Sequence, residues 1–193
     1  MWEAPLADKT NSTATTPRPY RSASSPQLLW LQESTTLSSA IIRYGDVVQM
    51  DVNVGTANHR VVKASTMANV PNVISTALLG IAVSVPDSPA STATATAPGS
   101  TEQGRLIGIL PASRRNEFLF PTKSSGVLSS VFGTRRALGY DSTLSMFYVD
   151  IGNSTAADAT VMITDIPEPG TDANNPCVVR FISTNTHRVV GSF

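Results

Sequence analysis

The stretch of residues 44–54, YGDVVQMDVNV, constrains the fold more than any other part of the chain. One apolar set alternates with a mainly polar set: Val48, Met50, Val52 and Val54 against Val47, Gln49, Asp51 and Asn53. A period of two places the two sets on opposite faces of a β-strand, so the pattern predicts a half-buried strand. No reactive group accompanies it, and we interpret the strand as part of a structural shell.

Two further strands are predicted close behind the first. Residues 55–59 supply turn chemistry, and residues 60–64, RVVKA, form a return strand. Residues 78–85, LLGIAVSV, form a third strand after another turn. Three short strands joined by loops predict a small antiparallel sheet or partial barrel, and we assign a first β module to residues 39–85.

Residues 105–193 return to short apolar runs separated by strong turn signals. The candidate strands are residues 105–110, 117–120, 126–132, 144–151, 159–166, 177–183 and 188–190. Only residues 124–140 have any helical character, and their glycines and β-branched residues weaken it. We therefore expect an all-β protein of small antiparallel barrel or sandwich modules, with residues 105–193 as the second module.

Two segments are polar and lack periodicity. Residues 1–38 are rich in Ser, Thr and Pro and are expected to form an extended N-terminal arm, because they offer too little apolar area to offset ordering. Residues 86–104 contain a run of Ala and Thr and are expected to form a linker or loop. An apolar island interrupts the arm at Leu28, Leu29, Trp30 and Leu31. The island either packs on its own domain or docks on a neighbouring subunit.

The charge content argues against several partners. Charged residues make up 15% of the 193 residues and the formal net charge is zero, against about 25% charged residues in typical soluble domains. A neutral chain gains little from counterion release, so we expect no nucleic-acid partner. We interpret the pair Arg114 and Arg115 as solvated or contact residues. The longest apolar run is too short to span a bilayer and the start lacks a secretory pattern, so we expect a soluble protein made in a reducing cytoplasm.

The sequence contains no recognisable catalytic or metal-binding set. Cys177 is the only cysteine, and His59 and His187 lack the spacing of a zinc site. Neither a nucleophile elbow nor a glycine-rich phosphate loop occurs. Residues 165–174 are rich in Asp and Asn, but without calcium-loop spacing they are interpreted as a turn. We expect no catalytic residue, cofactor or metal, although a dispersed triad is not excluded by sequence.

The aromatic residues are expected to be core residues, not a sugar-binding platform. They fall within apolar strand patterns: Phe118, Phe120, Phe132, Phe147, Tyr148 and Phe181.

Loose strand and turn motifs resemble a known family. Residues 45–48, GDVV, residues 61–64, VVKA, and residues 79–83, LGIAV, resemble the opening module of head-decoration and capsid-cement proteins of tailed phages. Residues 138–182 are similar to the carboxyl-terminal module of auxiliary capsid proteins of such phages. The two stretches that contain these motifs, residues 44–85 and 138–182, together cover a little under half of the chain, and neither contains a catalytic signature.

The resemblance implies a structural virion protein that binds and stabilises the outer surface of a phage capsid. Its implied partners are the major capsid protein and further copies of itself, as a trimer or dimer. The hypothetical interface residues are Leu28, Leu29, Trp30, Leu31, Arg114 and Arg115. The alternatives are a tail-associated or adhesive β protein that binds host glycans through exposed aromatics at loop tips, and a hydrolase with a dispersed triad.

Overall fold

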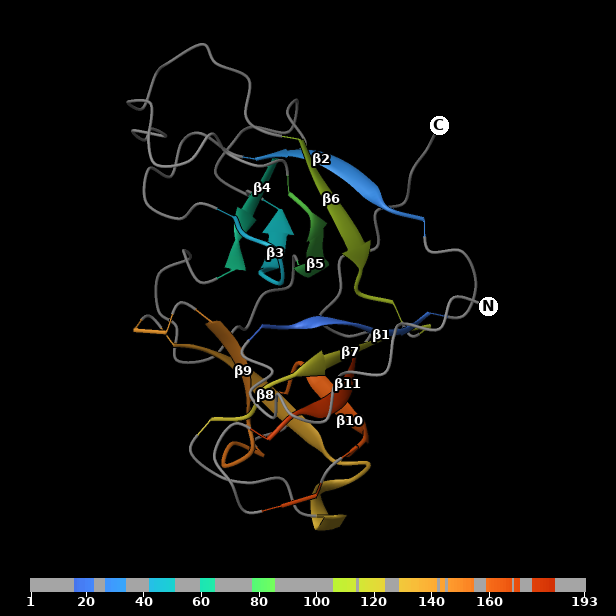
Figure 1. Cartoon of the computed structure of the whole chain (residues 1–193), viewed down its shortest axis with the longest axis vertical. Helices are drawn as coiled ribbons and strands as arrows, with labels where there is room; N and C mark the ends of the chain where they lie inside the picture. Colours follow the sequence, from blue (N-terminus) through green and yellow to red (C-terminus); the bar gives the residue numbers. More distant parts are fainter. Residues whose placement is uncertain are drawn as a thin grey trace.

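The computed structural model of the chain is built of β-strands in antiparallel sheets and a small closed barrel, as the sequence predicts. The structure describes residues 16–22, 27–33, 42–50, 60–64, 78–85, 106–113, 115–123, 129–141, 143–144, 146–154, 159–167, 169–170 and 175–182. The strands gather into two bodies, a barrel and a six-stranded sheet, which lie one above the other in Figure 1.

Five strands form the closed barrel. They are β2 (Leu29–Glu33), β3 (Val47–Met50), β4 (Arg60–Lys63), β5 (Leu78–Ser84) and β6 (Leu106–Pro111). Their order is β2-β4-β3-β5-β6, and every pairing is antiparallel except the parallel pair β2 and β4. Because β6 pairs back onto β2, the barrel has no free edge that could add a further strand.

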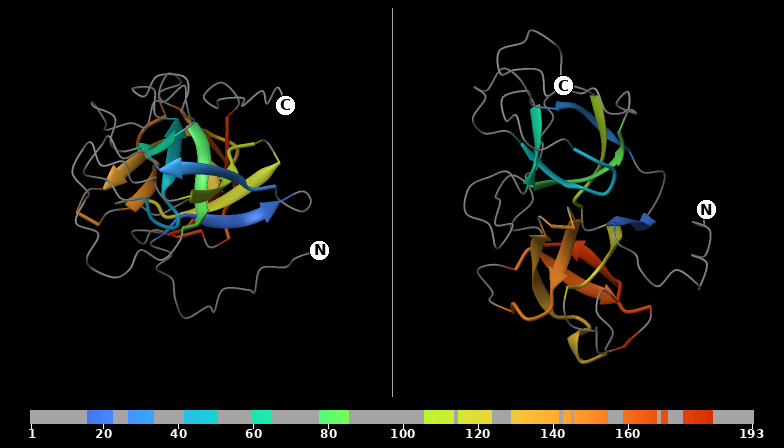
Figure 2. Two further views of the ribbon diagram at one scale, coloured as in Figure 1. Left: turned by 90° about the horizontal axis from the view of Figure 1, so that it is seen from above. Right: turned by 60° about the vertical axis from the view of Figure 1, so that its left-hand side comes forward.

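Six strands form the second body. They are β1 (Arg18–Ser22), β7 (Asn116–Phe120), β8 (Arg135–Asp141), β9 (Met146–Asp150), β10 (Val161–Asp165) and β11 (Cys177–Phe181). Their order is β1-β7-β11-β10-β8-β9, with antiparallel neighbours throughout. Figure 2 shows this sheet packed beside the barrel. The edge strand β1 contains Pro19, which has no N–H to offer to another chain.

Two clusters of buried hydrophobic side chains form the core of the protein. The first fills the barrel: Ile42, Val48, Val61, Leu79, Ala82, Ile107 and Ile109. The second joins the outside of the barrel to the sheet and includes Val47, Leu78, Ile81, Phe118, Phe120, Phe147 and Phe181. At its centre the Phe181 ring meets the rings of Phe118 and Phe120 edge to face, with centroids 5.5 and 6.4 Å away. The barrel and the sheet therefore share a buried core.

The expected boundaries of the arm and the two modules differ from the observed bodies. Within residues 1–38, which were expected to form an extended arm, β1 belongs to the sheet and β2 to the barrel, so these two segments are part of the folded bodies. Likewise β6, expected in the second module, completes the barrel. The remaining parts of the predicted arm, residues 1–15, 23–26 and 34–38, and the predicted linker, residues 86–104, lie outside the described residues.

The apolar island of the arm explains why β2 enters the barrel. Leu29 and Leu31 pack against the cluster inside the barrel, Leu28 packs against the shared core, and Trp30 points outward. The island thus packs on its own fold, which is the first of the two alternatives.

Most predicted strands within the described residues are confirmed, but residues 129–132 of the strand expected at 126–132 are not a strand, and residues 126–128 lie outside the described residues. Ser129–Val131 form a short 3₁₀ helix, η2, and Phe132 follows it in a turn in which its N–H donates to the Ser129 carbonyl. Phe132 is 61% exposed, so its expected place in the core is also wrong. The strand expected at residues 188–190 lies outside the described residues.

The strand β8 was not among the candidate strands of the sequence, and Gly139 lies within it. Gly139 lies directly opposite Tyr148 of β9, and a Cβ atom on it would lie 2.4 Å from the Tyr148 ring. This glycine therefore makes room for a cross-strand aromatic ring and does not end the strand.

Candidate interface surfaces

The described residues offer no assembled reactive centre. Within the described ranges, no group of three His, Cys, Asp or Glu side chains could hold a metal ion. His59 and His187 lie outside the described residues, as do Glu168, Asp172 and Asn174 of the acidic turn. Cys177 is buried in β11, and burial raises the pKa of its thiol to about 12. The nucleophile is the thiolate, so this cysteine is inert in the folded protein.

We expect a thiol reagent at pH 8 to leave the native protein unmodified and to label one thiol per chain after denaturation, since the chain has one cysteine. Labelling followed by mass spectrometry of the intact protein measures this. Rapid modification without denaturant would show that β11 is not buried as described.

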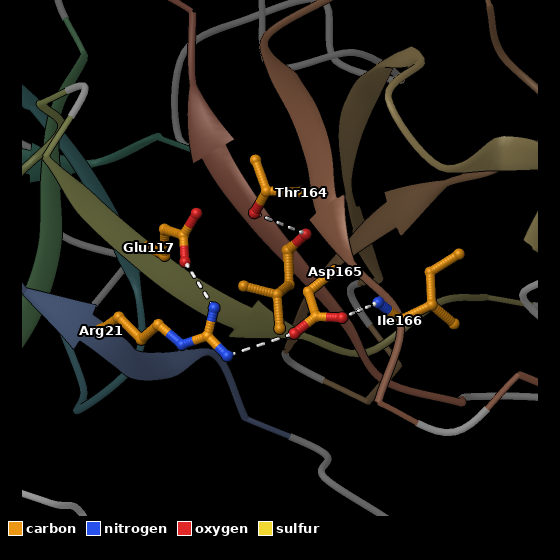
Figure 3. A network of polar contacts seen from close by, with 6 residues as sticks. Arg21, Glu117, Thr164, Asp165 and Ile166 are labelled. Atoms are coloured by element: carbon orange, nitrogen blue, oxygen red, sulfur yellow. Dashed lines mark hydrogen bonds and ion pairs between the residues drawn. The ribbon is translucent and has the colours of Figure 1, made fainter.

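Asp165, the described member of the acidic turn, takes part in a structural network (Figure 3). The Arg21 guanidinium lies 3.4 Å from Asp165 and 3.7 Å from Glu117, so it links β1 to β10 and β7. The second Asp165 oxygen accepts the N–H of Ile166. Arg21 is largely exposed, so these ion pairs contribute little to stability and serve mainly to position the edge strand.

Among the described members of the six predicted interface residues, Trp30 is the one with a large, exposed apolar side chain. Its side chain is 50% exposed on the outside of the barrel and lies across Gly108 of β6. A Cβ atom on Gly108 would lie 3.1 Å from the indole, so the glycine lets the ring lie against the barrel wall. Leu106, also about half exposed, is a neighbour on this face. We call Trp30, Leu106 and Gly108 the Trp30 face.

Arg115, the described member of the predicted contact pair, does not join the Trp30 face. Arg115 is exposed in the turn beyond the carboxyl end of β6, whereas Trp30 packs near the amino end of that strand. Arg114 lies outside the described residues.

A buried ion pair lies at the junction of the two bodies. Lys63 Nζ of β4 is 3.0 Å from Asp46, and both side chains are almost fully buried. From the sheet, the Tyr140 and Phe147 ring centroids lie 4.8 and 5.9 Å from the same ammonium group. Burial raises the pKa of the Asp46 carboxyl, and the Lys63 charge opposes that rise. The sequence analysis did not single out this pair.

A cleft opens beside this ion pair, between the barrel and the sheet. Its volume is about 200 Å³, and its lining includes Arg43, Tyr44, Asp46, Leu144, Met146 and Phe147. Tyr44 and Leu144 are 50% and 59% exposed, so the rim of this junction cleft carries two large apolar side chains beside the exposed Arg43. We did not predict this surface, because its two sides lie about a hundred residues apart in the sequence.

The chain matches no family model, no curated protein and no solved structure. In the described part of the chain, none of the helical segments is long and apolar enough to cross a membrane.

Proposed function

We propose that the chain is a structural protein of a tailed-phage particle that binds the outer surface of the head and stabilises it. The observation that supports this most is the Trp30 face, a half-exposed indole packed over Gly108 on a closed barrel that shares a buried core with a second body. A rigid body of this kind can bridge neighbouring shell subunits without a reacting group. Internal genome pressure loads such joints, and added contact area opposes their separation.

Trp30 has the properties of an interface anchor. Tryptophan is enriched among the few residues that dominate binding energy, and a side chain already fixed in place loses little entropy on binding. The backbone of β2 is held on both sides, by β6 and by β4, so the indole is presented from a stable strand.

We expect Trp30→Ala to weaken binding to phage heads by about 30-fold or more, the effect of losing a hot-spot side chain. The measurement is cosedimentation of purified protein with heads of the encoding phage that lack it. Phe132→Ala is the matched control, because it removes another exposed aromatic ring from a turn at the sheet. Equal affinity of the Trp30 variant and the control would remove Trp30 as the anchor.

Host-glycan binding is the second candidate, and two side chains favour it. Tyr44 and Phe132 are exposed aromatics in turns, which is where an adhesive protein presents sugar-stacking rings. Binding of the purified protein to host cells, reduced by Tyr44→Ala and Phe132→Ala together, would support adhesion. Binding to heads that survives Phe132→Ala would support the first candidate, because Phe132 belongs to neither surface proposed to contact the head.

A further inference from the structure

The junction cleft has two exposed side chains on its rim, each contributed by a different body. Tyr44 comes from the turn before β3 of the barrel, and Leu144 from the hairpin between β8 and β9 of the sheet. Exposed apolar side chains that gather at a concave site are typical of binding surfaces, whereas isolated ones have no such meaning.

The Tyr44 turn is rigid. Gly45 has φ +86°, and a Cβ atom there would lie 2.6 Å from the Pro17 carbonyl oxygen, so only glycine fits. The Asp46 carboxylate accepts the N–H of Arg43 at 2.7 Å, and the N–H of Gly45 donates to the Ala82 carbonyl at 2.8 Å. These contacts fix the direction in which Arg43 and Tyr44 leave the barrel.

The Leu144 hairpin is also held in place. The Asp141 carboxylate accepts the N–H groups of Thr143 and Leu144 at 2.9 and 3.1 Å. Lys123 Nζ lies 2.9 Å from the other Asp141 oxygen and lowers the pKa of that carboxyl. Because both sides of the cleft are already ordered, little conformational entropy is lost when something binds between them.

The size and charge of the cleft define what fits. Its volume of about 200 Å³ is below the ~300 Å³ at which drug-sized ligand sites begin, so it suits one side chain and not a whole small molecule. Met146 and Phe147 add two buried apolar side chains to a lining that also includes the polar residues Thr16, Arg43 and Asp46. The negative charge of Asp46 is already paired with the positive charge of Lys63. The net charge of the cleft is therefore positive and comes from the exposed Arg43. The matching ligand is an apolar side chain next to a carboxylate.

We propose that the junction cleft binds an extended acidic and apolar segment of the shell subunit, inserting one apolar side chain between Tyr44 and Leu144 while its carboxylate pairs with Arg43. This inference rests on the proposed function and adds a second contact to the Trp30 face. Arg and Tyr at the rim match the composition of protein–protein hot spots, which favours a protein partner.

The test uses the full-length protein and heads of the encoding phage that lack it. Arg43→Glu and Leu144→Asp should each weaken head binding about 30-fold or more, the effect of losing a hot-spot side chain. Arg135→Glu and Phe132→Asp are the matched controls, since both residues are exposed and neither lines the cleft. Raising the salt concentration should weaken binding of the wild type more than that of Arg43→Gln, because exposed charge pairs are screened.

Each outcome has a distinct meaning. Wild-type protein that binds heads, together with cleft variants that bind equally well, would overturn the cleft proposal and leave the proposed function standing. Wild-type protein that does not bind heads would remove the proposed function itself. Sedimentation velocity of the free protein tests whether a second copy of this chain occupies the cleft instead. An oligomer that Leu144→Asp converts to a monomer would assign the cleft to a second copy and overturn the proposal.

Discussion

Replacing Lys63 with Met should lower the free energy of unfolding by about 3–5 kcal/mol, as expected when one partner of a buried ion pair is removed. The substitution leaves the Asp46 carboxylate buried without its partner at 3.0 Å, and it removes the ammonium group that Tyr140 and Phe147 contact from the sheet. Urea denaturation followed by circular dichroism measures the change.

The double variant Asp46→Asn with Lys63→Met separates charge burial from packing. Asn keeps a side-chain oxygen that can accept the N–H of Arg43, and the neutral pair no longer buries a charge. We expect the double variant to recover most of the lost stability, since replacing a whole buried pair by neutral groups is often tolerated. A double variant as unstable as Lys63→Met alone would contradict this account of the junction.

The pH dependence of the Lys63→Met penalty has a defined sign. Burial raises the pKa of Asp46 above its ordinary value of 3.8, and the variant removes the Lys63 charge that opposes this rise. A carboxyl with a raised folded-state pKa stabilises the fold below its unfolded pKa, and this contribution is lost as pH rises through the folded value. The penalty should therefore shrink as pH falls from 7 toward 4.5. A penalty that grows on acidification would be inconsistent with a buried Asp46.

Replacing Phe181 with Ala should cost about 3–5 kcal/mol and should destabilise the barrel together with the sheet. Phe181 lies at the centre of the shared core, where it meets Phe118 and Phe120. Two probes follow the unfolding of the two bodies separately. Trp30 fluorescence reports on the barrel, measured in a variant in which Trp2 is replaced by Phe, and the labelling of Cys177 reports on the sheet.

Within each protein, the two probes should give the same denaturant midpoint, because barrel and sheet unfold in one transition. This should hold for the wild type and for Phe181→Ala, although the midpoint of the variant is lower. Phe132→Ala should change stability by less than about 0.5 kcal/mol, because this ring is exposed. Separate midpoints for Trp30 and Cys177 would mean that the barrel and the sheet fold independently.

The strand pattern of the sequence predicted most of the fold because alternation is a local signal. The strands β3, β4 and β5 were predicted in sequence order, and β3 and β5 do pair antiparallel in the barrel. Closure was not predictable, because it depends on pairing β2 with β6, which lie far apart in the chain. The five-residue strand β2 was too short and too isolated among polar residues to distinguish from an arm.

One face of β3 was expected to be polar and solvent-exposed, but packing against the sheet buries it. Gln49 was placed on the solvent side of its strand, yet it is fully buried, and neither amide atom has a hydrogen-bond partner among the described residues. Val47 on the same side packs into the shared core, because the sheet covers this side of the barrel. Long-range contact between the bodies therefore buries β3 on both faces.

The exposed surfaces that we propose as interfaces could be predicted from the sequence only in part. Trp30 was conspicuous as an indole in a polar segment, and it is exposed as an anchor would be. The junction cleft needs Tyr44 and Leu144 to be brought together by the fold, and no local pattern indicates this. One signal was present: Lys63 lies directly between Val62 and Ala64, and a lysine within an apolar strand indicates a buried partner.

The most direct test of the central claim is the copy number of this chain in purified particles of the phage that encodes it, measured by quantitative mass spectrometry. A protein that binds the outside of the head should be present at a fixed ratio to the shell subunit and at comparable abundance. Particles that contain none of it, or only the few copies expected of a tail component, would contradict the proposal.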